Sequence, residues 1–412
     1  MSSQSIALPA SPWRSPVFII TIGCLIAMIG FGIRSVFGLF LEPMTLANGW
    51  DRQTFALAMA IQNLVWGLGV PVAGALADRY GPSKVMALGA IAYGLGVWGM
   101  AAATSSLELH LFGGILTGLG VAFTAFSLAI AAIAKVVGPE RRSLALGLGT
   151  AAGSFGQVVF SPLGQTFIAN FGWHSAMLIL AASALLIVPL AFGLPHITTG
   201  KGELHSNQTL GNALREALEH KGFILLTVGF FVCGFHVAFI TVHFPAYVKD
   251  LGLAPQVGAY SIALIGLCNI IGSFASGAAG QRWSMKCGLS FIYFARAVAI
   301  TGLLLLPKTE VTIYAFAAIM GLLWLSTVPL TTGIVARVFG VRYMATLFGI
   351  VFLSHQLGSF LGVWLGGYLY DAIGSYDPVW WAGIALGLLA ALIHLPINEN
   401  PLIRKAAPAA AE

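Results

Sequence analysis

The feature that most restricts this chain is a succession of long apolar segments. A helix needs about 20 mainly apolar residues to cross the ~30 Å hydrocarbon layer of a membrane. Twelve segments of about this length follow one another, separated by polar breaks such as Asn48-Gly49-Trp50-Asp51 and Gly81-Pro82-Ser83. They are residues 16–44, 53–77, 84–104, 108–136, 143–168, 173–194, 222–248, 255–281, 286–306, 311–338, 343–371 and 378–397. We therefore expect an all-α protein that crosses a membrane twelve times.

The composition excludes several other classes of protein. Of the 412 residues, 58% are hydrophobic and only 8% are charged, whereas about 25% are charged in an ordinary soluble domain. This balance is incompatible with a cytosolic enzyme, a disordered chain or a nucleic-acid binder. The four cysteines show no CxxC spacing, so we expect neither a metal site nor a cofactor.

The longest internal polar stretch, residues 196–221, divides the chain into two halves with six apolar segments each. We expect an N-terminal bundle over residues 1–195, a cytoplasmic central loop over 196–221, and a C-terminal bundle with a short tail over 222–412.

The two halves also repeat one another. The stretch 74–80 is matched by 277–283 at an offset of 203, and the pattern Arg-x-x-Ala-x-x-x-Gly at 142–149 is matched at 342–349. Agreement at nearly one offset predicts two homologous six-helix bundles related by pseudo-symmetry, the parallel-repeat plan of some transporters.

Basic residues predict the orientation. If both termini are cytoplasmic, fifteen Lys and Arg residues fall on the cytoplasmic side and only Arg52, Lys249 and Lys308 on the opposite side. Cytoplasmic loops are enriched in these residues. We therefore expect a multi-pass protein of the inner membrane with both termini in the cytoplasm.

One loop carries a recognisable motif. Gly74-Ala-Leu-Ala-Asp78-Arg79-Tyr-Gly81, between the second and third apolar segments, resembles the signature of the major facilitator superfamily. The resemblance implies the fold of that family, and it implies that this loop and its counterparts latch the two bundles in one state of the transport cycle. The candidate gating residues are Gly74, Asp78, Arg79, Gly81, Arg142, Arg282 and Arg342.

Two helices resemble a particular branch of that superfamily. Gly32-Ile-Arg34-Ser-Val-Phe37-Gly38 in the first segment and Cys233-Gly-Phe-His236 in the seventh look like the monocarboxylate porters, near the oxalate/formate exchangers. Animal members carry an Asp/Arg pair in the eighth helix, where this chain has Asn269. The resemblance implies a small monocarboxylate as substrate and makes Asn269 a candidate for binding it.

Ionisable residues inside the membrane point to the charge of the ligand. Each costs about 2.5–3.5 kcal/mol on insertion scales and is therefore a functional candidate. The apolar segments contain Arg34, Arg296 and several histidines, while all fourteen carboxylates fall in loops, tails or segment ends. A cavity with basic groups and no acidic partner favours an anion, because a cationic or neutral ligand would leave the arginines desolvated and unpaired.

The repeat places these residues relative to one another. At an offset of 202, Arg34 superposes on His236, so we expect the two to face each other across the pseudo-twofold axis, with His243 two turns further along the same helix. We expect His355 and Gln157 to face one another from the eleventh and fifth segments. The candidate substrate-binding residues are Arg34, Gln157, His236, His243, Asn269, Arg296 and His355.

These observations predict a secondary active transporter of a small organic anion that works by alternating access as a monomer. Proton symport would run through His236 or His243, because a histidine titrates near neutral pH. Two alternatives stay open: an anion exchanger of the oxalate/formate type, and an exporter of amphiphilic compounds. An enzyme is not expected, since the chain has neither HExxH nor GxSxG, and no nucleic-acid partner is expected.

Overall fold

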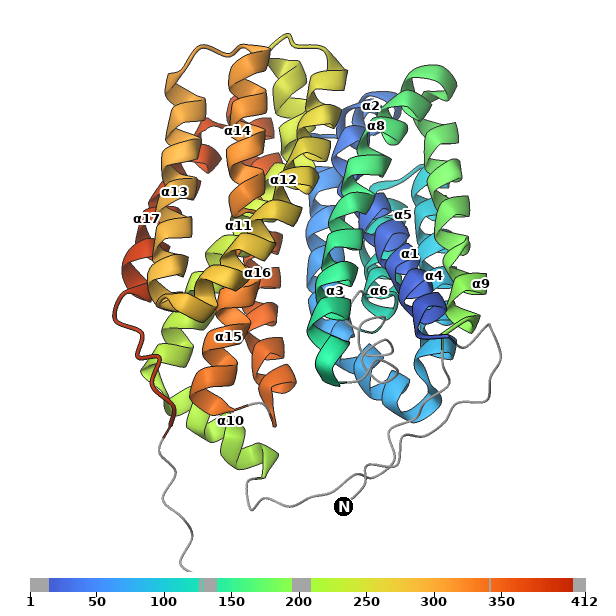
Figure 1. Ribbon diagram of the computed structural model, residues 1–412. Helices are drawn as coiled ribbons and strands as arrows, with labels where there is room; N and C mark the ends of the chain where they lie inside the picture. The colour runs from blue at the N-terminus through green and yellow to red at the C-terminus, as the bar shows by residue number, and fades with distance from the viewer. Residues whose placement is uncertain (1–14, 126–127, 129–138, 195–208, 341, 403–412) are drawn as a thin grey trace, which may run out of the picture.

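The computed structural model describes residues 15–125, 128, 139–194, 209–340 and 342–402, apart from the side chains of Pro16 and 139–147. Its regular elements are all helical (Figure 1). The first half contains α1 (Pro16–Ser35), η2 (Phe37–Phe40), α2 (Leu41–Asn48), α3 (Arg52–Tyr80), α4 (Pro82–Ala102), α5 (Ser106–Leu109), η3 (His110–Leu116), α6 (Thr117–Phe123), α8 (Pro139–Leu185) and α9 (Ile187–Phe192). The second half contains α10 (Leu210–Glu219), α11 (Lys221–Asp250), α12 (Pro255–Arg282), α13 (Met285–Leu305), α14 (Glu310–Leu323), α15 (Thr327–Phe339), α16 (Met344–Ile373) and α17 (Asp377–His394).

Within the described residues, eleven helical segments are long and apolar enough to cross a membrane. One of them, Leu148–Phe192, has 45 residues and would measure about 68 Å if straight, enough for two crossings. It turns at Gly172, whose φ of 78° lies in the region that glycine adopts most readily. Large apolar side chains such as Leu68, Trp98 and Phe274 are more than half exposed, as expected for a surface in contact with lipid. The predicted all-helical membrane fold is thus confirmed.

Some helix boundaries differ from the prediction. The first segment is not one helix over 16–44, because α1 ends at Ser35 and the chain continues as the 3-10 turn η2 and the short α2. The tenth is interrupted between α14 and α15. Part of the predicted loop 196–221 forms α10. The fourth segment is helical as far as Phe123, and most of its remainder lies outside the described residues.

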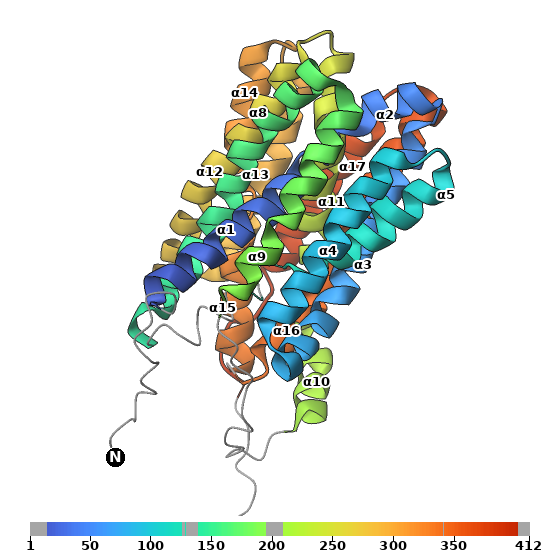
Figure 2. The same cartoon turned by 90° about the vertical axis from the view of Figure 1, so that its right-hand side faces the viewer.

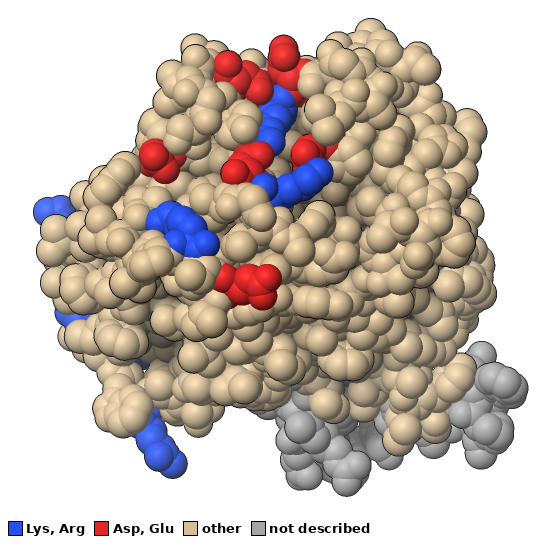
Figure 3. All heavy atoms as spheres, turned by 90° about the horizontal axis from the view of Figure 1, so that it is seen from above, with Lys and Arg blue, Asp and Glu red and all other residues tan. Residues whose placement is uncertain are grey.

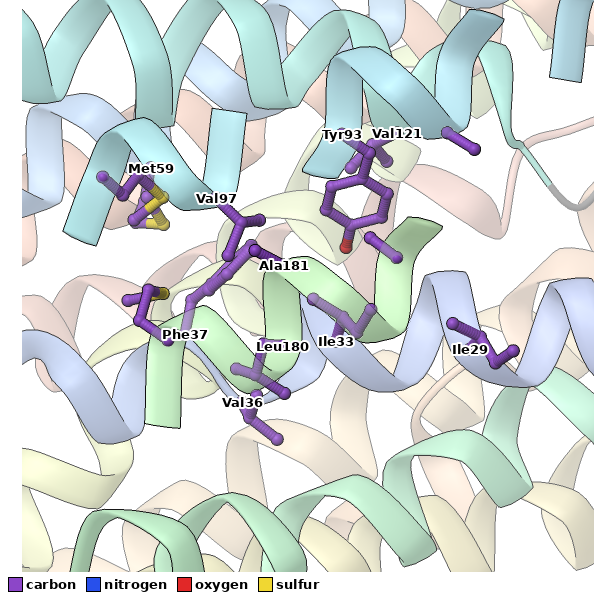
Figure 4. Close-up of a cluster of buried hydrophobic side chains, with 14 of the residues drawn as sticks. Ile29, Ile33, Val36, Phe37, Met59, Tyr93, Val97, Val121, Leu180 and Ala181 are labelled. Carbon is purple, nitrogen blue, oxygen red and sulfur yellow. The ribbon is translucent and has the colours of Figure 1, made fainter. Parts of the chain in front are cut away.

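The buried apolar side chains form two clusters: the first lies mainly in the N-terminal half but includes Ala238, Val242, Ala246, Ala259 and Val363, and the second lies in the C-terminal half. Figures 1 and 2 show the long helices of both halves running side by side from one end of the molecule to the other. Figure 4 shows part of the first cluster: Ile33 of α1 lies between Tyr93 of α4 and Leu180 of α8, and Ile29 lies further along α1. The Tyr93 hydroxyl donates a hydrogen bond to the carbonyl of Gly30 at 3.0 Å, which joins α4 to α1.

Four pairs of elements make the main contacts between the halves: α3 with α16, α8 with α12, η2 with α11, and α2 with α11. The first two are called here the α3–α16 seam and the α8–α12 seam. The upper end of the molecule in Figure 1 carries the α2–α3, α11–α12 and α16–α17 turns, and the lower end carries α10 and the α3–α4 turn.

Glycines show where the α3–α16 seam is tight. A Cβ atom added to Gly367 would lie within 3.0 Å of atoms of Arg52, Gln53 and Ala56, and one added to Gly67 would lie 2.7 Å from the Gln356 side chain. Nearer the lower end, a Cβ atom added to Gly74 or to Gly349 would meet nothing within 4 Å. The seam is therefore closed at the upper end and in the middle, and it opens toward the lower end.

Candidate functional site

Arg34 lies where α1 ends, facing α3. Its Nη2 atom donates a hydrogen bond to Asn63 Oδ1 at 2.7 Å, and its guanidinium carbon lies 4.5 Å from the centre of the Trp66 ring. The side chain is half-buried. Both contacts are with neutral groups, and no described carboxylate forms an ion pair with it. Among the described residues, Arg34 thus has no ion-pair partner, and it lies against the part of α3 that contacts α16.

The α16 helix completes this region from the other half of the chain. The backbone carbonyl of Asn63 accepts a hydrogen bond from Gln356 Nε2 at 2.8 Å, and Gln356 Oε1 accepts one from His355 Nδ1 at 2.9 Å. The Trp66 ring packs edge-on against Phe352, with 5.3 Å between centroids. Arg34, Asn63, Trp66, His355 and Gln356 are called here the central polar cluster. It links the two bundles at mid-molecule.

The prediction that His236 faces Arg34 is wrong in this conformation. His236 is buried, and its Nε2 atom donates a hydrogen bond to the carbonyl of Gly383 in α17 at 2.8 Å. The ring occupies space left by two glycines, since a Cβ atom added to Gly383 or Gly387 would lie 3.4 Å from it. The face of α11 that carries His236 therefore turns toward α17, away from the contact between the bundles.

His243 likewise bonds within the C-terminal half, and both of its ring nitrogens are engaged. Nε2 donates to the carbonyl of Val363 at 2.8 Å, so Nδ1 accepts from the Tyr376 hydroxyl at 3.2 Å. Burial raises the pKa of Tyr376, which keeps its hydroxyl protonated and able to donate. With both nitrogens engaged and no exposed surface, His243 has no position for a further ligand in this conformation.

Arg296 is fully buried and holds the break between α14 and α15. Its Nη2 atom donates to the carbonyl of Leu323 at 2.7 Å and to that of Trp324, and it lies 3.6 Å from Cys233 Sγ. Carbonyl groups at a helix C-terminus lack hydrogen-bond donors within the helix. Here the Arg296 guanidinium is the donor to two of them. A solute in a cavity cannot reach Arg296 in this conformation, so its observed contacts are structural.

Gln157 and Asn269 lie at the α8–α12 seam. Gln157 Nε2 donates to the carbonyl of Ile262 at 2.9 Å, and Asn269 Nδ2 donates to Ser154 Oγ at 2.9 Å. Asn269 Oδ1 accepts from the backbone N–H of Leu325, in the α14–α15 break, at 2.9 Å. Asn269 thus connects α8 to that break. Gln157 does not face His355 as predicted, because the two side chains belong to different seams.

The upper end carries a set of ion pairs that the sequence did not predict. Both terminal nitrogens of Arg52 reach the Asp250 carboxylate, at 2.6 and 2.8 Å, and Lys249 pairs with Glu42 at 2.8 Å. Asp371 accepts the first two backbone N–H groups of α3, from Arg52 and Gln53, at 3.1 and 2.6 Å. The upper ion-pair cluster consists of Glu42, Arg52, Lys249, Asp250 and Asp371. Seen from above in Figure 3, acidic and basic side chains gather on this face.

Each interaction of the upper ion-pair cluster joins the N-terminal half to the C-terminal half, and Arg52 is the most heavily engaged member. It also donates to the Tyr376 hydroxyl at 2.9 Å and lies over the Tyr370 ring at 3.8 Å. The sequence does carry a signal for this cluster, since opposite charges occur at the ends of segments that face one another. Counting the basic residues alone predicts the orientation of the chain but not these pairs.

The candidate gating residues lie at the lower end. Asp78 and Arg79 are exposed near the end of α3, and Gly81, with φ of 90°, joins α3 to α4. Arg282 is exposed at the end of α12, and Arg342 is exposed beside Tyr343. The side chain of Arg142 lies outside the described residues. Among the described residues, no group of three His, Cys, Asp or Glu side chains could hold a metal ion.

Comparisons with known proteins bear on the whole chain. The family model described as Major Facilitator Superfamily matches residues 20–363. Monocarboxylate transporter 13 of Bos taurus is 27% identical over 357 residues, which cover 84% of this chain and 80% of the relative. The uncharacterized MFS-type transporter YcxA of Bacillus subtilis (strain 168) is 26% identical over 377 residues, covering 88% of this chain and 90% of the relative.

Solved structures have the same fold. A bacterial homolog of the human lysosomal transporter Spinster, in an inward-facing and unoccupied conformation, superposes with a TM-score of 0.76 at 16% identity, over 93% of this chain and 97% of that one. The inward-open xylose transporter XylE from E. coli superposes with a TM-score of 0.70 at 14% identity, over 93% of this chain and 96% of that one. The family and these relatives are transporters rather than enzymes. This multi-pass membrane protein therefore belongs to the major facilitator superfamily.

Proposed function

We propose that the chain carries a small organic anion, a monocarboxylate, across the inner membrane by alternating access, with Arg34 as the anchor for the carboxylate. The observation that carries this proposal is the half-buried Arg34 guanidinium, whose partners among the described residues are an amide and an aromatic ring. A guanidinium can hold a carboxylate with two parallel hydrogen bonds. The name of the relatives, monocarboxylate transporters, agrees with this chemistry.

The central polar cluster gives the anion contacts on both bundles. Arg34, Asn63 and Trp66 belong to the N-terminal half, while His355 and Gln356 belong to the C-terminal half. Since the first group is already hydrogen-bonded to the second, a ligand held by Arg34 touches or adjoins both halves. This position lets the occupancy of the site influence how the two halves are placed relative to one another.

We assign the lower end to the cytoplasm, because the excess of basic residues predicts that side. The described conformation then opens inward, since the α3–α16 seam is tight at Gly367 and open at Gly74. In the opposite state, the lower-end residues Asp78, Arg79, Arg282 and Arg342 would approach one another and serve as the inner latch.

Exchange of one anion for another is a second candidate mode. His236 and His243, expected to carry a coupling proton, both donate to backbone carbonyls and are buried. The central polar cluster contains no carboxylate, and His355 is its one histidine. Exchange needs no proton carrier, whereas symport in this arrangement would depend on His355 or on the protonated substrate.

Uptake of a labelled monocarboxylate such as lactate into proteoliposomes tests the proposal. Loss of a hydrogen bond to a charged group costs about 1.5–3 kcal/mol, so Arg34→Ala should reduce uptake about 10- to 100-fold. Arg34→Lys should retain part of it, because the charge stays but the planar pair of donors is lost. Arg215→Ala, in the exposed helix α10, is the matched control. Wild-type uptake by folded Arg34→Ala would overturn the assignment.

The coupling mode needs a separate measurement. Net uptake driven by an imposed pH gradient should be compared with exchange of internal unlabelled for external labelled substrate without a gradient. Symport predicts that the gradient accumulates substrate and that His355→Gln abolishes this accumulation. Pure exchange predicts uptake only when internal anion is present, whatever the gradient.

A further inference from the structure

A pocket, called here the upper pocket, lies at the upper end beside Glu42 and Lys249. It has a volume of about 120 Å³, room for several water molecules and hence for a carboxylate of a few heavy atoms. Both bundles contribute to its walls, the N-terminal half through η2, α2 and α8 and the C-terminal half through α11 and α12. Its charged side chains are Glu42 and Lys249, and its other lining residues are Gly38, Leu39, Pro43, Gln165, Ile168, Pro245, Ala246 and Pro255.

The pocket is separated from the interior by direct backbone packing. Gly38 lines it, and a Cβ atom added at Gly38 would collide with the carbonyl oxygens of Thr241 and Val242 in α11. Thr241 lies about two turns below Lys249 along the same helix. A ligand could therefore occupy this pocket while the path to Arg34 is still shut.

The two cations of the upper ion-pair cluster differ in how much binding capacity they have left. Arg52 is bound to both oxygens of Asp250 and to Tyr376, and one face of it is covered by Tyr370. Its side chain is only 12% exposed. Lys249 has a single anionic partner, Glu42, and its side chain is 46% exposed. An ammonium group has three donors, so Lys249 is the cation that a solute anion can reach.

We propose that this pocket is an outer binding site for a small carboxylate, in which the solute replaces Glu42 as the partner of Lys249. This replacement leaves the Lys249 ammonium paired, because the carboxylate of the solute takes the place of the Glu42 carboxylate. Exposed ion pairs of this kind are weakly held, which makes the replacement easy. The inference rests on the proposed function, since it assigns to the transported anion a second, earlier position on its path.

The replacement has a consequence for the outer closure. Glu42 belongs to the N-terminal half and Lys249 to the C-terminal half, so their ion pair joins the bundles. Once the solute occupies Lys249, this link is lost, while the links of Arg52 to Asp250 and of Asp371 to α3 persist. Arrival of the anion therefore loosens the upper end at the point where the anion must enter.

The test compares Lys249→Gln with Glu42→Gln in oriented proteoliposomes, measuring the KM for lactate from each side. Both substitutions break the same ion pair. If the pair acts only in closure, both should shift the outer KM in the same direction. If Lys249 binds the solute and Glu42 competes with it, Lys249→Gln should raise the outer KM about threefold or more, and Glu42→Gln should lower it.

Lys308→Gln is the matched control, because Lys308 donates only to the carbonyls of Leu303, Leu304 and Leu306 at the end of α13. It should leave the outer KM unchanged, and the inner KM should stay at the wild-type value in all three variants. Equal shifts in Lys249→Gln and Glu42→Gln, or none, would overturn the outer site. That result would leave the proposed function intact if transport still requires Arg34, whereas a wild-type protein that carries no monocarboxylate would refute the proposed function itself.

Discussion

Two arginines inside the bundles hold their charges in different ways. Arg34 is half-buried and contacts one amide and one ring, so its guanidinium has capacity for an anion. Arg296 has no exposed surface, and its Nη2 atom donates to the carbonyls of Leu323 and Trp324 at the end of α14, while its buried Nε and Nη1 atoms have no hydrogen-bond partner among the described residues. A charge inside a membrane protein is a functional candidate by default, and the partners of each arginine decide which kind of function it has.

Arg296→Ala should therefore lower stability without changing the affinity for substrate. The substitution leaves two buried carbonyls without a donor and creates a cavity, which together cost about 2–4 kcal/mol. Thermal unfolding of the purified protein in detergent measures this loss, and uptake by the folded fraction gives KM. Arg215→Ala should unfold at the wild-type temperature. A raised KM with wild-type stability would make Arg296 a substrate ligand instead.

At the scale of single residues, the sequence indicates which side chains are functional candidates, but it does not indicate which side chains they contact. Arg34 could be picked out because a lone cation in an apolar segment is rare. The direction of His236 could not be predicted, because α11 is buried on nearly all sides, and apolar periodicity then gives no information about which face meets which neighbour. The position of His236 is fixed by Gly383 and Gly387 of α17, whose proximity to α11 is a tertiary property.

At the scale of elements, two of the transport helices are interrupted. The first changes from α1 to η2 where Gly38 meets the backbone of α11. The tenth breaks between α14 and α15, where Arg296 binds the free carbonyls and Asn269 binds the N–H of Leu325. Interrupted helices are found at the binding sites of other transporters. Hydropathy could predict neither break, because the apolar character is continuous through both.

Gly38→Ala should prevent the upper end from closing. The added methyl group would occupy the position of the Thr241 and Val242 carbonyl oxygens, so α1 and α11 must separate. We expect loss of most uptake and a shift toward an outward-open state.

The shift toward an outward-open state can be measured by cysteine labelling. Ala246, in the pocket at the upper end, is replaced by cysteine in a variant whose native cysteines are serine, and its reaction with a membrane-impermeant maleimide is followed. Gly302→Ala is the control, because a Cβ atom there meets nothing within 4 Å, and it should label slowly like the parent. Slow labelling together with full uptake in Gly38→Ala would contradict the expectation.

For the whole molecule, the closed upper end depends on charges contributed by both halves. Arg52→Asp should place three carboxylates together, with Asp250 and Asp371, and repulsion should open the upper end and reduce uptake. Asp250→Arg added to Arg52→Asp should restore part of it, with a coupling energy of about 1–3 kcal/mol. A double-mutant cycle of uptake rates measures this coupling. Independent effects of the two substitutions would mean that the ion pair contributes nothing to closure.

For the whole molecule, the sequence predicted the architecture but not the conformation. Segment length and hydropathy determine how often a chain crosses a membrane, which is why the all-helical fold could be predicted. Which end is open depends on contacts such as Gly367 with Gln53. These join residues more than 300 positions apart, so no local pattern encodes them.

The tight contact between Gly67 and Gln356 lies near the middle of α3, 14 residues from Gln53 and 13 from Tyr80. Each arm of the helix thus measures about 20 Å. If the halves rotate by about 15° around this point, the two ends of α3 move by about 5 Å in opposite directions, roughly one helical pitch. Gly67 then lies at the pivot of this rotation. Because the two arms of α3 are nearly equal, the separation of the halves at one end increases by as much as it decreases at the other.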